Sequence, residues 1–392
     1  MRFVAIQMLM GDKAKYLGIL MGLTFASFLI TQQASIFVGL MTRTFGFLTD
    51  TSGPDIWIMD SKVQFIDDIK PLQDTMLQRA RGVEGVAYAV PMYKGILRAR
   101  LDDGTFQSCN VIGLDDPSLV GGPPEMVEGS LEDLRRSESV IVDDTGANGK
   151  LARIPVDEHG DPIPGAKRIP LKVGDTMELN DKRAIVVGIC HVSRTFQSQP
   201  VIYTSYSRAM RFAPSERKLL SFIVAKAAEG QDPKVVCQRI REQTGLDAQT
   251  GRDFSWKTIV YFMKYTGIPI NFGISVMLGF LVGTAIAGQT FYNFTLDNLR
   301  HFGALKAMGT SNIRLLGMIL LQGSIVGVIG YGLGVGLAAT MGSLFEDTEL
   351  AFRLLWHTLV IAGGAVTLIC LFASLLSIQK VIRLEPAVVF KG

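Results

Sequence analysis

Four stretches of this 392-residue sequence are apolar over lengths that suit a membrane crossing, and no other feature limits the possible folds as strongly. A helix needs roughly 20 mostly apolar residues to cross the hydrocarbon core of a bilayer. The stretches lie at residues 17–41, 268–294, 315–342 and 354–378. The mean hydropathy of +0.29 is also high for a soluble domain. The sequence therefore predicts four transmembrane helices.

A long block of ordinary polarity, residues 42–266, separates the first two stretches. It is long enough to bury its own core, in one or two lobes. Helical spacing of apolar residues (Leu72, Met76 and Leu77 on one face) predicts a helix at 72–81 and another follows at 231–245. Alternating patterns predict strands at 86–91, 94–101, 107–114, 139–143, 183–190 and 200–203. The Gly- and Pro-rich segments 115–136 and 155–170 are expected to be surface insertions.

Lys and Arg near the ends of the stretches predict their orientation, because cytoplasmic loops carry an excess of both residues. Three segments are basic and are expected in the cytoplasm: 1–16, 295–314 and the tail 379–392. The connection between the third and fourth stretches is acidic and is expected outside. We therefore expect an α-helical membrane protein with four transmembrane helices and a large extracytoplasmic α+β domain inserted between helices 1 and 2.

The N-terminal segment has two interpretations. Phe3, Ile6 and Met10 on one side fit an amphipathic helix on the inner membrane surface, and the alternative is the plain cytoplasmic start of the first span. A cleaved signal peptide ending near Gln33 is disfavoured, since the apolar stretch continues to Met41.

Glycines four residues apart recur in the apolar stretches. The third stretch contains Gly323–Gly327 and Gly332–Gly336, and the pairs Gly18–Gly22 and Gly279–Gly283 lie in the first and second. This spacing lets helix backbones approach closely in a membrane, although a single pair can arise by chance. No ionisable residue lies well inside a stretch, which argues against an ion-driven pump with a site at the membrane midplane.

The sequence disfavours several function classes. The net charge of +3, without basic runs interleaved with aromatics, gives no sign of nucleic-acid binding. His159 and His191 lie in unrelated contexts, and no nucleophile elbow or zinc motif occurs. The sequence lacks GxxxxGK[ST], so the chain is expected to bind no nucleotide, metal or other cofactor itself. The acidic pairs at 67–68, 102–103, 115–116 and 143–144 are expected to be solvated caps.

Four cysteines are present, and none forms a CxxC pair. Cys370 falls in the fourth stretch, where a small packing residue is the simplest interpretation. Cys109 and Cys190 could form a disulfide if their domain is extracytoplasmic, but the sequence alone does not decide this.

The basic loop between the second and third stretches carries the most specific motif. It reads Arg300-His-Phe-Gly-Ala-Leu-Lys-Ala-Met-Gly309 and resembles the R-E-x-G-x-L-K-A-x-G signature of MacB/FtsX-type (type VII) ABC transporter permeases. The layout of the whole chain resembles this family too, including Pro386 after the last stretch. His301 departs from the pattern, which commonly has Glu. The unfused layout and residues 110–115 are similar to the DevC branch, which is associated with glycolipid export.

This resemblance implies a homodimer or heterodimer that pairs with two separate ABC ATPase subunits, which would hold ATP and Mg. A short helix near 298–308 would dock into the ATPase, with Phe302 and Leu305 giving apolar contact and Arg300 and Lys306 giving charge complementarity. Gly309 would let the chain turn into the next span. The residues expected to couple to the ATPase are Arg300, His301, Phe302, Ala304, Leu305, Lys306, Met308 and Gly309. An ordinary basic connector remains the alternative for this loop.

The resemblance further implies a non-catalytic permease subunit in the inner (plasma) membrane, which transmits ATPase motion to its outer domain. It would export or extract a hydrophobic or amphiphilic substrate such as a lipid, glycolipid, lipoprotein or drug, with membrane lipids and a periplasmic adaptor or membrane-fusion protein as further partners. The alternative is an FtsX-like regulator of a cell-wall hydrolase, and a 225-residue outer block favours the exporter. A membrane-anchored enzyme is disfavoured because no catalytic constellation occurs.

Overall fold

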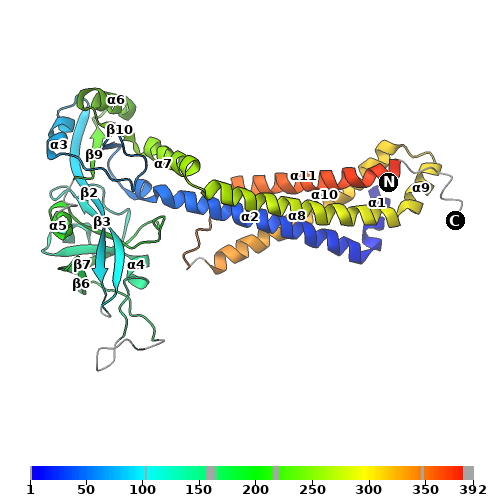
Figure 1. Ribbon diagram of the computed structural model, residues 1–392, viewed down its shortest axis with the longest axis horizontal. Coiled ribbons are helices and arrows are strands. Elements are labelled where there is room, and N and C mark those ends of the chain that lie inside the picture. Colours follow the sequence, from blue (N-terminus) through cyan, green and yellow to red (C-terminus); the bar gives the residue numbers. More distant parts are fainter. Residues whose placement is uncertain are drawn as a thin grey trace. The chain divides into compact units, whose positions relative to one another are not determined.

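A computed structural model describes residues 2–382, except 102–103, 156–162, 164–165, 215–219 and 346–347. The chain divides into two compact units (Figure 1). The helical unit comprises Met1–Leu40 and Gly267–Gly392, and the α+β domain comprises Met41–Thr266. The boundary between them falls within one long helix, α2 (Lys13–Asp50). The inserted α+β domain predicted from the sequence is therefore present.

The helical unit contains four helices long and apolar enough to cross a membrane, counted over the described residues. They are α2, α8 (Ile268–Asp297), α10 (Asn312–Leu344) and α11 (Trp356–Ile382). The first three contain the predicted stretches 17–41, 268–294 and 315–342, whereas α11 begins two residues after the start of the stretch predicted at 354–378. Two shorter helices complete the unit, α1 (Arg2–Gly11) and α9 (Leu299–Ala307). In α1, Phe3 and Met10 are exposed, whereas Ala5 and Leu9 are buried against other helices.

Small residues set the distance between the membrane helices. A Cβ atom added at Gly22 of α2 would lie 2.5 Å from Ile286 of α8, and one added at Gly283 of α8 would clash with Ala26 of α2. Both positions need glycine because the two helices touch there through backbone and short side chains. The expected close packing at Gly18–Gly22 and Gly279–Gly283 therefore lies along the α2–α8 contact.

The α+β domain is built on one ten-stranded sheet within the described residues, in the order β10-β1-β9-β2-β3-β8-β5-β7-β4, with β6 pairing β2 and β7. The strands are β1 (Ile56–Met59), β2 (Val86–Arg100), β3 (Phe106–Leu114), β4 (Glu125–Glu128), β5 (Ser139–Asp143), β6 (Thr176–Leu179), β7 (Lys182–His191), β8 (Val201–Ser205), β9 (Phe222–Ala227) and β10 (Asp247–Thr250). The sheet forms two lobes that share β2.

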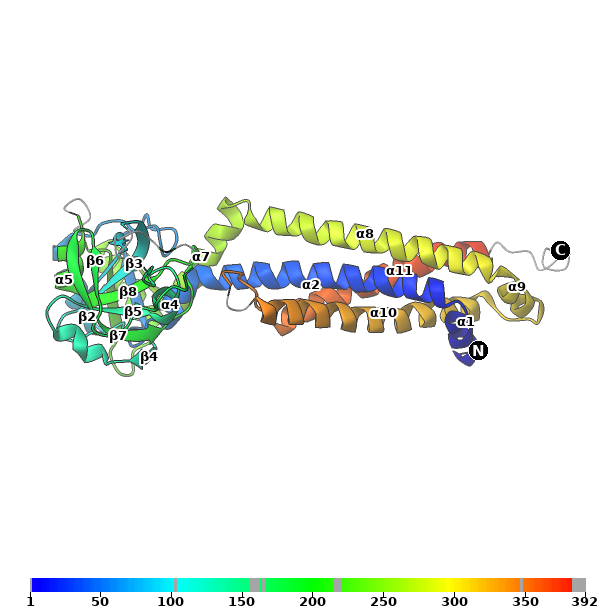
Figure 2. The same cartoon turned by 90° about the horizontal axis from the view of Figure 1, so that it is seen from below.

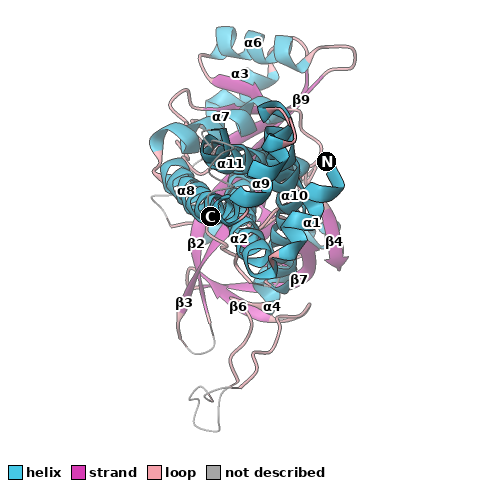
Figure 3. Ribbon diagram, turned by 90° about the vertical axis from the view of Figure 1, so that its right-hand side faces the viewer, coloured by secondary structure: helices cyan, strands magenta, loops and turns pink. Residues whose placement is uncertain are grey.

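The first lobe has the antiparallel order β10-β1-β9-β2, with the two helices α3 (Asp74–Arg81) and α6 (Pro233–Thr244) together on one face (Figures 1 and 3). This is a split β-α-β arrangement. Ile58 and Ile223 of the sheet pack against Val236 and Ile240 of α6 beneath the helices. Helix α7 (Gly251–Tyr265) follows β10 and places Phe254 on the opposite face of the sheet, against Trp57 and Phe222.

The sequence of α6 contains the residues that begin the helix, bury one of its faces and end it. Asp232 caps it by accepting a hydrogen bond from the backbone N–H of Lys234 at 2.9 Å, and Pro233 occupies the first turn. Val236 and Ile240, four residues apart, are buried on one face. Gly245 ends the helix with φ of +74°, a conformation that glycine adopts without a steric cost. This helix agrees with the one predicted at 231–245.

The second lobe is inserted between β2 and β9 and contains β3 to β8, with the helices α4 (Asp144–Asn148) and α5 (Tyr206–Phe212) and the 3-10 helix η1 (Leu131–Arg135). Its strands are mixed in direction, since β3 runs parallel to β8 and β5 runs parallel to β7. Val111, Val140, Val186 and Ile202 contribute to a core on one face, where Phe212 of α5 also packs.

Two sequence predictions need correction in this domain. The two strands expected at 86–91 and 94–101 are one strand, β2, which pairs with β9 through its first half and with β3 through its second. The segment 115–136 is not a surface insertion, because Leu119 and Leu134 belong to the core and β4 pairs with β7. The expected insertion at 155–170 lies largely outside the described residues.

Candidate coupling site

Helix α9 forms a bridge between α8 and α10, at the end of the helical unit that also holds α1 (Figures 2 and 3). The chain turns sharply at both ends of the helix. At its start, the side-chain amide of Asn298 donates to the carbonyl of Phe294 at 2.8 Å, and the N–H of Phe302 donates to the carbonyl of Asn298 at 3.1 Å. The connection is therefore a structured helix with hydrogen bonds at its entry.

Phe302 holds α9 in place. Its side chain is completely buried in a cluster with Ala5 of α1, Leu315 and Ile319 of α10, and Ile378 of α11. Leu305 is half-buried against the same cluster. The expectation that Phe302 contacts an ATPase is therefore wrong, because this residue already packs inside its own chain.

The outward face of α9 carries the other expected coupling residues. Arg300, His301, Ala304, Met308 and Gly309 are exposed. Lys306 is half-buried, and its ammonium donates to the backbone carbonyl of Ile382, at the end of α11, at 2.9 Å. The expected coupling residues therefore divide into an exposed set, available to a partner, and the set Phe302, Leu305 and Lys306, which fixes the helix to its neighbours.

Gly309 ends α9 in the left-handed conformation, with φ of +89°. Its N–H donates to the carbonyl of Lys306 at 3.0 Å, and the N–H of Thr310 donates to the carbonyl of Leu305 at 3.1 Å. This pair of bonds is a Schellman cap, which favours glycine at this position. The geometry explains the Met-Gly-Thr sequence at the end of the basic loop.

Sequence reasoning missed one exposed residue next to α9. Ile313, in the first turn of α10, is 80% exposed, and Met308 is 73% exposed on the other side of Gly309. Arg314 is exposed beside Ile313. An apolar side chain just after a helix start was the available signal, since such a residue usually packs inward. Arg300, Met308, Ile313 and Arg314 are named here the outer surface of the loop.

Of the four glycines of α10 that were expected to pack against other helices, only two do so in this chain. A Cβ at Gly323 or Gly327 would meet Ser374 and Cys370 of α11, at 3.0 and 2.8 Å, so these two glycines pack as predicted. Gly332 and Gly336 have open space around them, so no described part of this chain packs against them, and their role in helix packing stays a prediction. The residues that contact α2 are instead Gly330 and Gly334, which lie against Leu23 and Ser27.

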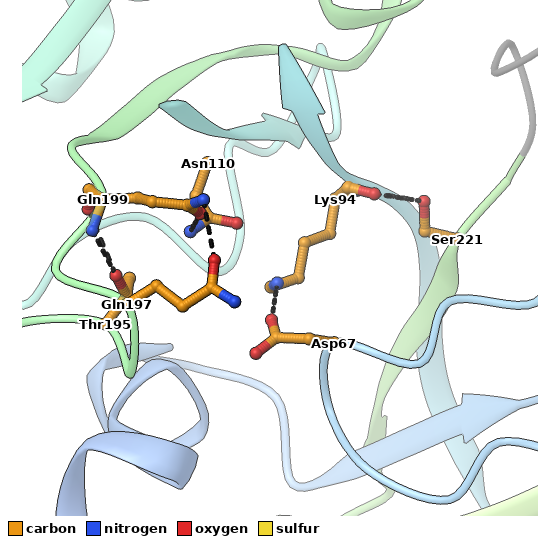
Figure 4. A network of polar contacts seen from close by, with 7 residues as sticks. All are labelled: Asp67, Lys94, Asn110, Thr195, Gln197, Gln199 and Ser221. Carbon is orange, nitrogen blue, oxygen red and sulfur yellow. Dashed lines mark hydrogen bonds and ion pairs between the residues drawn. The ribbon is translucent and has the colours of Figure 1, made fainter. Parts of the chain in front are cut away.

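A second polar group of interest lies in the α+β domain (Figure 4). The ammonium of Lys94 forms an ion pair with Asp67 and lies 5.6 Å from the ring centroid of Phe47. The backbone N–H of Lys94 donates to the Ser221 hydroxyl, which donates in turn to the Lys94 carbonyl, both at 3.0 Å. The Lys94 side chain is only 5% exposed. Lys94 therefore joins β2 to Ser221, the residue before β9, through its backbone and to Asp67 through its side chain.

Asn110, one of the residues similar to the DevC branch, has a structural role beside this group. Its side-chain amide donates to Gln199 at 2.9 Å, and the Gln199 backbone N–H donates to the Thr195 hydroxyl at 2.9 Å (Figure 4). These contacts hold the loop before β8 against β3. A cavity of about 30 Å³ between Lys94 and Asn110 has room for roughly one water molecule.

The other candidates from the sequence have structural partners. Asp143 accepts hydrogen bonds from the N–H groups of Gly146 and Val201, so it is a cap, but it is buried and not solvated as expected, and burial raises the pKa of its carboxyl. His191 pairs with Asp144 at 2.9 Å. Asp102, Asp103 and His159 lie outside the described residues.

The four cysteines are buried free thiols. Cys109 and Cys190 belong to different core clusters and form no disulfide, and burial raises the pKa of both thiols well above the ordinary value. No group of three His, Cys, Asp or Glu side chains suited to a metal ion occurs in the described part of the chain.

Comparison with known proteins agrees with this layout. Residues 18–243 match the family model of the MacB-like periplasmic core domain, and residues 259–386 match that of the FtsX-like permease C-terminal region. The chain belongs to the MacB/FtsX-type ABC transporter permeases. The MacB/FtsX assignment places the four apolar helices in a membrane and the α+β domain outside the cytoplasm.

Relatives support the same assignment. An uncharacterized ABC transporter permease of Mycobacterium tuberculosis (strain ATCC 25618 / H37Rv) is 25% identical over 346 residues, covering 88% of this MacB/FtsX-type chain and 86% of the relative. An uncharacterized ABC transporter permease of Methanocaldococcus jannaschii is 26% identical over 182 residues, covering 45% of each chain.

Two solved structures were also matched. The extracellular domain of the noncanonic ABC-type transporter YknZ from Gram-positive bacteria covers 50% of this chain and 98% of its own, at 13% identity and a TM-score of 0.33. The periplasmic region of MacB from Actinobacillus actinomycetemcomitans covers 55% and 95%, at 14% identity and a TM-score of 0.35. At these TM-scores the two matches add nothing to the family assignment.

Proposed function

We propose that this permease is the membrane subunit of an ATP-driven exporter that extracts or exports a hydrophobic or amphiphilic molecule. A separate ATPase subunit binds ATP and Mg and docks on the outer surface of the loop. The observation that carries the proposal is the arrangement of α9, in which Phe302 is buried in the helical unit while Arg300 and Met308 are exposed. A helix held in this way can pass a displacement to α8 and α10, which a flexible connector could not do.

The outer surface of the loop has the composition of a protein-binding patch. Met308 and Ile313 are large exposed apolar residues at one end of the helical unit, and Arg300 and Arg314 lie near them as exposed cations. Exposed apolar residues with charged neighbours are typical of interaction sites. The partner surface is therefore expected to be an apolar groove with acidic residues at its rim.

Several features support the export direction and the assembly. Lys and Arg gather on the loop that contains α9, which favours a cytoplasmic position for it and a position in the inner (plasma) membrane for the chain. The match of residues 18–243 to a MacB-like periplasmic core domain favours an exporter that works through its outer domain over an FtsX-like regulator. Two copies of the chain, two ATPase subunits and an extracytoplasmic adaptor would make up the complex.

The test is to purify the full-length chain with its copurifying ATPase and to measure ATP hydrolysis in proteoliposomes. Met308→Asp should reduce the hydrolysis coupled to the permease by at least tenfold, the cost of losing about 1.4 kcal/mol at a docking contact. Val235→Asp, at an exposed position of α6, is the matched control and should leave hydrolysis unchanged. Equal hydrolysis in Met308→Asp and the native chain would refute docking at this surface.

The cargo class is tested separately with the same preparation. Transfer of a fluorescent lipid or an acylated peptide out of the proteoliposomes on addition of ATP is the expected result. ATP hydrolysis without transfer of any amphiphile, together with ATP-dependent activation of a cell-wall hydrolase, would replace the exporter by the FtsX-like regulator.

A further inference from the structure

A groove runs between α10 and α11 on the surface of the helical unit, with a volume of about 310 Å³. Its walls are residues 320–331 of α10 and 363–374 of α11. Gly327 and Gly363 lower the two walls, and the side chains of Val328 and Leu371 form exposed rims. No charged residue lines it.

Most of the hydroxyl groups that line the groove donate hydrogen bonds to backbone carbonyls. Ser324 donates to the carbonyl of Leu320, Thr367 to that of Gly363, both at 2.8 Å, and Tyr331 to that of Leu359 at 3.1 Å. The Ser374 hydroxyl is fully buried toward Gly323, where an added Cβ would lie 3.0 Å from it. The groove therefore presents mainly hydrocarbon to a ligand.

The dimensions of the groove match a narrow apolar occupant. Twelve helical residues on each wall, eleven steps at 1.5 Å, give a length of about 16 Å, and dividing the volume by this length leaves a cross-section of about 19 Å². That is about the cross-section of one extended hydrocarbon chain. A helix, with a diameter of about 10 Å or more, does not fit into the groove as a whole and could enter it only with single side chains.

The position of the groove along α10 and α11 also suits a hydrocarbon chain. The groove begins and ends about 10 to 12 Å from the two ends of α11, so it lies within the hydrocarbon core of a bilayer. A polar headgroup would lie beyond it. We propose that this groove binds one acyl chain of a bilayer lipid, which fills the space between α10 and α11.

Photolabelling tests this proposal in the full-length chain. The chain is reconstituted in vesicles of phosphatidylethanolamine and phosphatidylglycerol that contain a phospholipid with a diazirine at the middle of one acyl chain. After irradiation, labelled residues are mapped by mass spectrometry. Leu371 and Val328 should be labelled several-fold more than Leu333, an exposed residue of α10 outside the groove.

Two neighbouring glycines provide a matched pair of variants. Gly363→Leu places its side chain in the groove, where a Cβ meets Tyr331 at an ordinary 3.6 Å, whereas Gly364→Leu points into open space. Labelling of Leu371 should fall several-fold in Gly363→Leu and stay unchanged in Gly364→Leu. Ser324→Phe fills the groove from the opposite wall and decides the matter if Gly363→Leu does not fold.

Equal labelling of Leu371 and Leu333 in the native chain would overturn the proposal, because the groove would then be ordinary lipid-facing surface. Unchanged labelling of Leu371 in a correctly folded Gly363→Leu or Ser324→Phe chain would do the same.

Discussion

Lys94 and Asp67 form an ion pair in which the lysine is 5% exposed and the aspartate is 44% exposed. Substituting one residue of the pair leaves the charge of the other unpaired, and the environment of that remaining charge differs between the two cases. Removing the aspartate leaves a cation in the core without its counter-ion, whereas removing the lysine leaves a carboxylate that water can reach.

Asp67→Ala is expected to destabilise the α+β domain by about 1–3 kcal/mol, less than for a fully buried pair because Asp67 is partly solvated. Lys94→Met keeps the aliphatic packing and should cost under about 1 kcal/mol. Hydrogen exchange of the β2 amides in the full-length chain measures both free energies. Equal losses in the two variants would show that the pair acts symmetrically and contradict this account.

Gly309→Ala is expected to weaken the end of α9 by about 1–2 kcal/mol, because alanine is strained at a φ of +89°. Gly317→Ala in α10 is the control, since a Cβ has open space at both positions and only the backbone conformation differs. Exchange of the amides of residue 309 and Thr310, the two donors of the cap, should speed up in the first variant alone. The same exchange rates in both would mean that the Schellman cap adds no stability.

Gly334→Ala should lower the thermal midpoint of the detergent-solubilised chain, because its Cβ would lie 2.5 Å from the Ser27 Cβ and 2.6 Å from the Thr24 carbonyl oxygen. Overpacking of this kind typically costs about 1–3 kcal/mol. Gly332→Ala, two residues away, has open space and should leave the midpoint unchanged. A larger effect at Gly332 would mean that this glycine contacts a partner helix.

His191 gives the domain a pH-dependent contribution. The hydrogen bond to the Asp144 carboxylate raises the pKa of His191 above 6.5, and Glu125 and Asp50 act in the same direction. A raised folded-state pKa means that the pair stabilises fully below the unfolded value and loses its effect as pH rises through the folded value.

His191→Gln should therefore destabilise the chain more at about pH 5.5 than at about pH 8.5. The difference should stay under about 1 kcal/mol, since the imidazole is largely exposed. Thermal unfolding of both chains at the two pH values measures it. An effect of equal size at both would exclude a charged pair.

The membrane helices were predictable because apolar length is a local property of the sequence. Strands β1 and β9 were missed for the opposite reason. Ile56–Met59 is buried at every position and the first four residues of Phe222–Ala227 are as well, so neither shows the alternation that marks a half-buried strand. Their identity depends on helices α3, α6 and α7, which cover both faces of this part of the sheet.

The position of the candidate site in the sequence was predictable, but which of its side chains are exposed was not. The motif located α9 and its terminal glycine, but nothing in it distinguishes Phe302, which is buried, from Met308, which is exposed. That distinction is made by packing against α1, α10 and α11, and α1 and α11 are distant in sequence. The glycines of α10 show the same limit, since residues two apart, such as Gly332 and Gly334, lie about 200° apart around a helix.

The burial of Phe302 also bears on how a load would spread through the molecule. Because the ring is packed among α1, α10 and α11, and Lys306 is bonded to the end of α11, α9 is fixed to several neighbouring helices. Under the proposed docking, a push on its outward face would be shared by these helices at once, instead of being absorbed by bending at the two ends of α9.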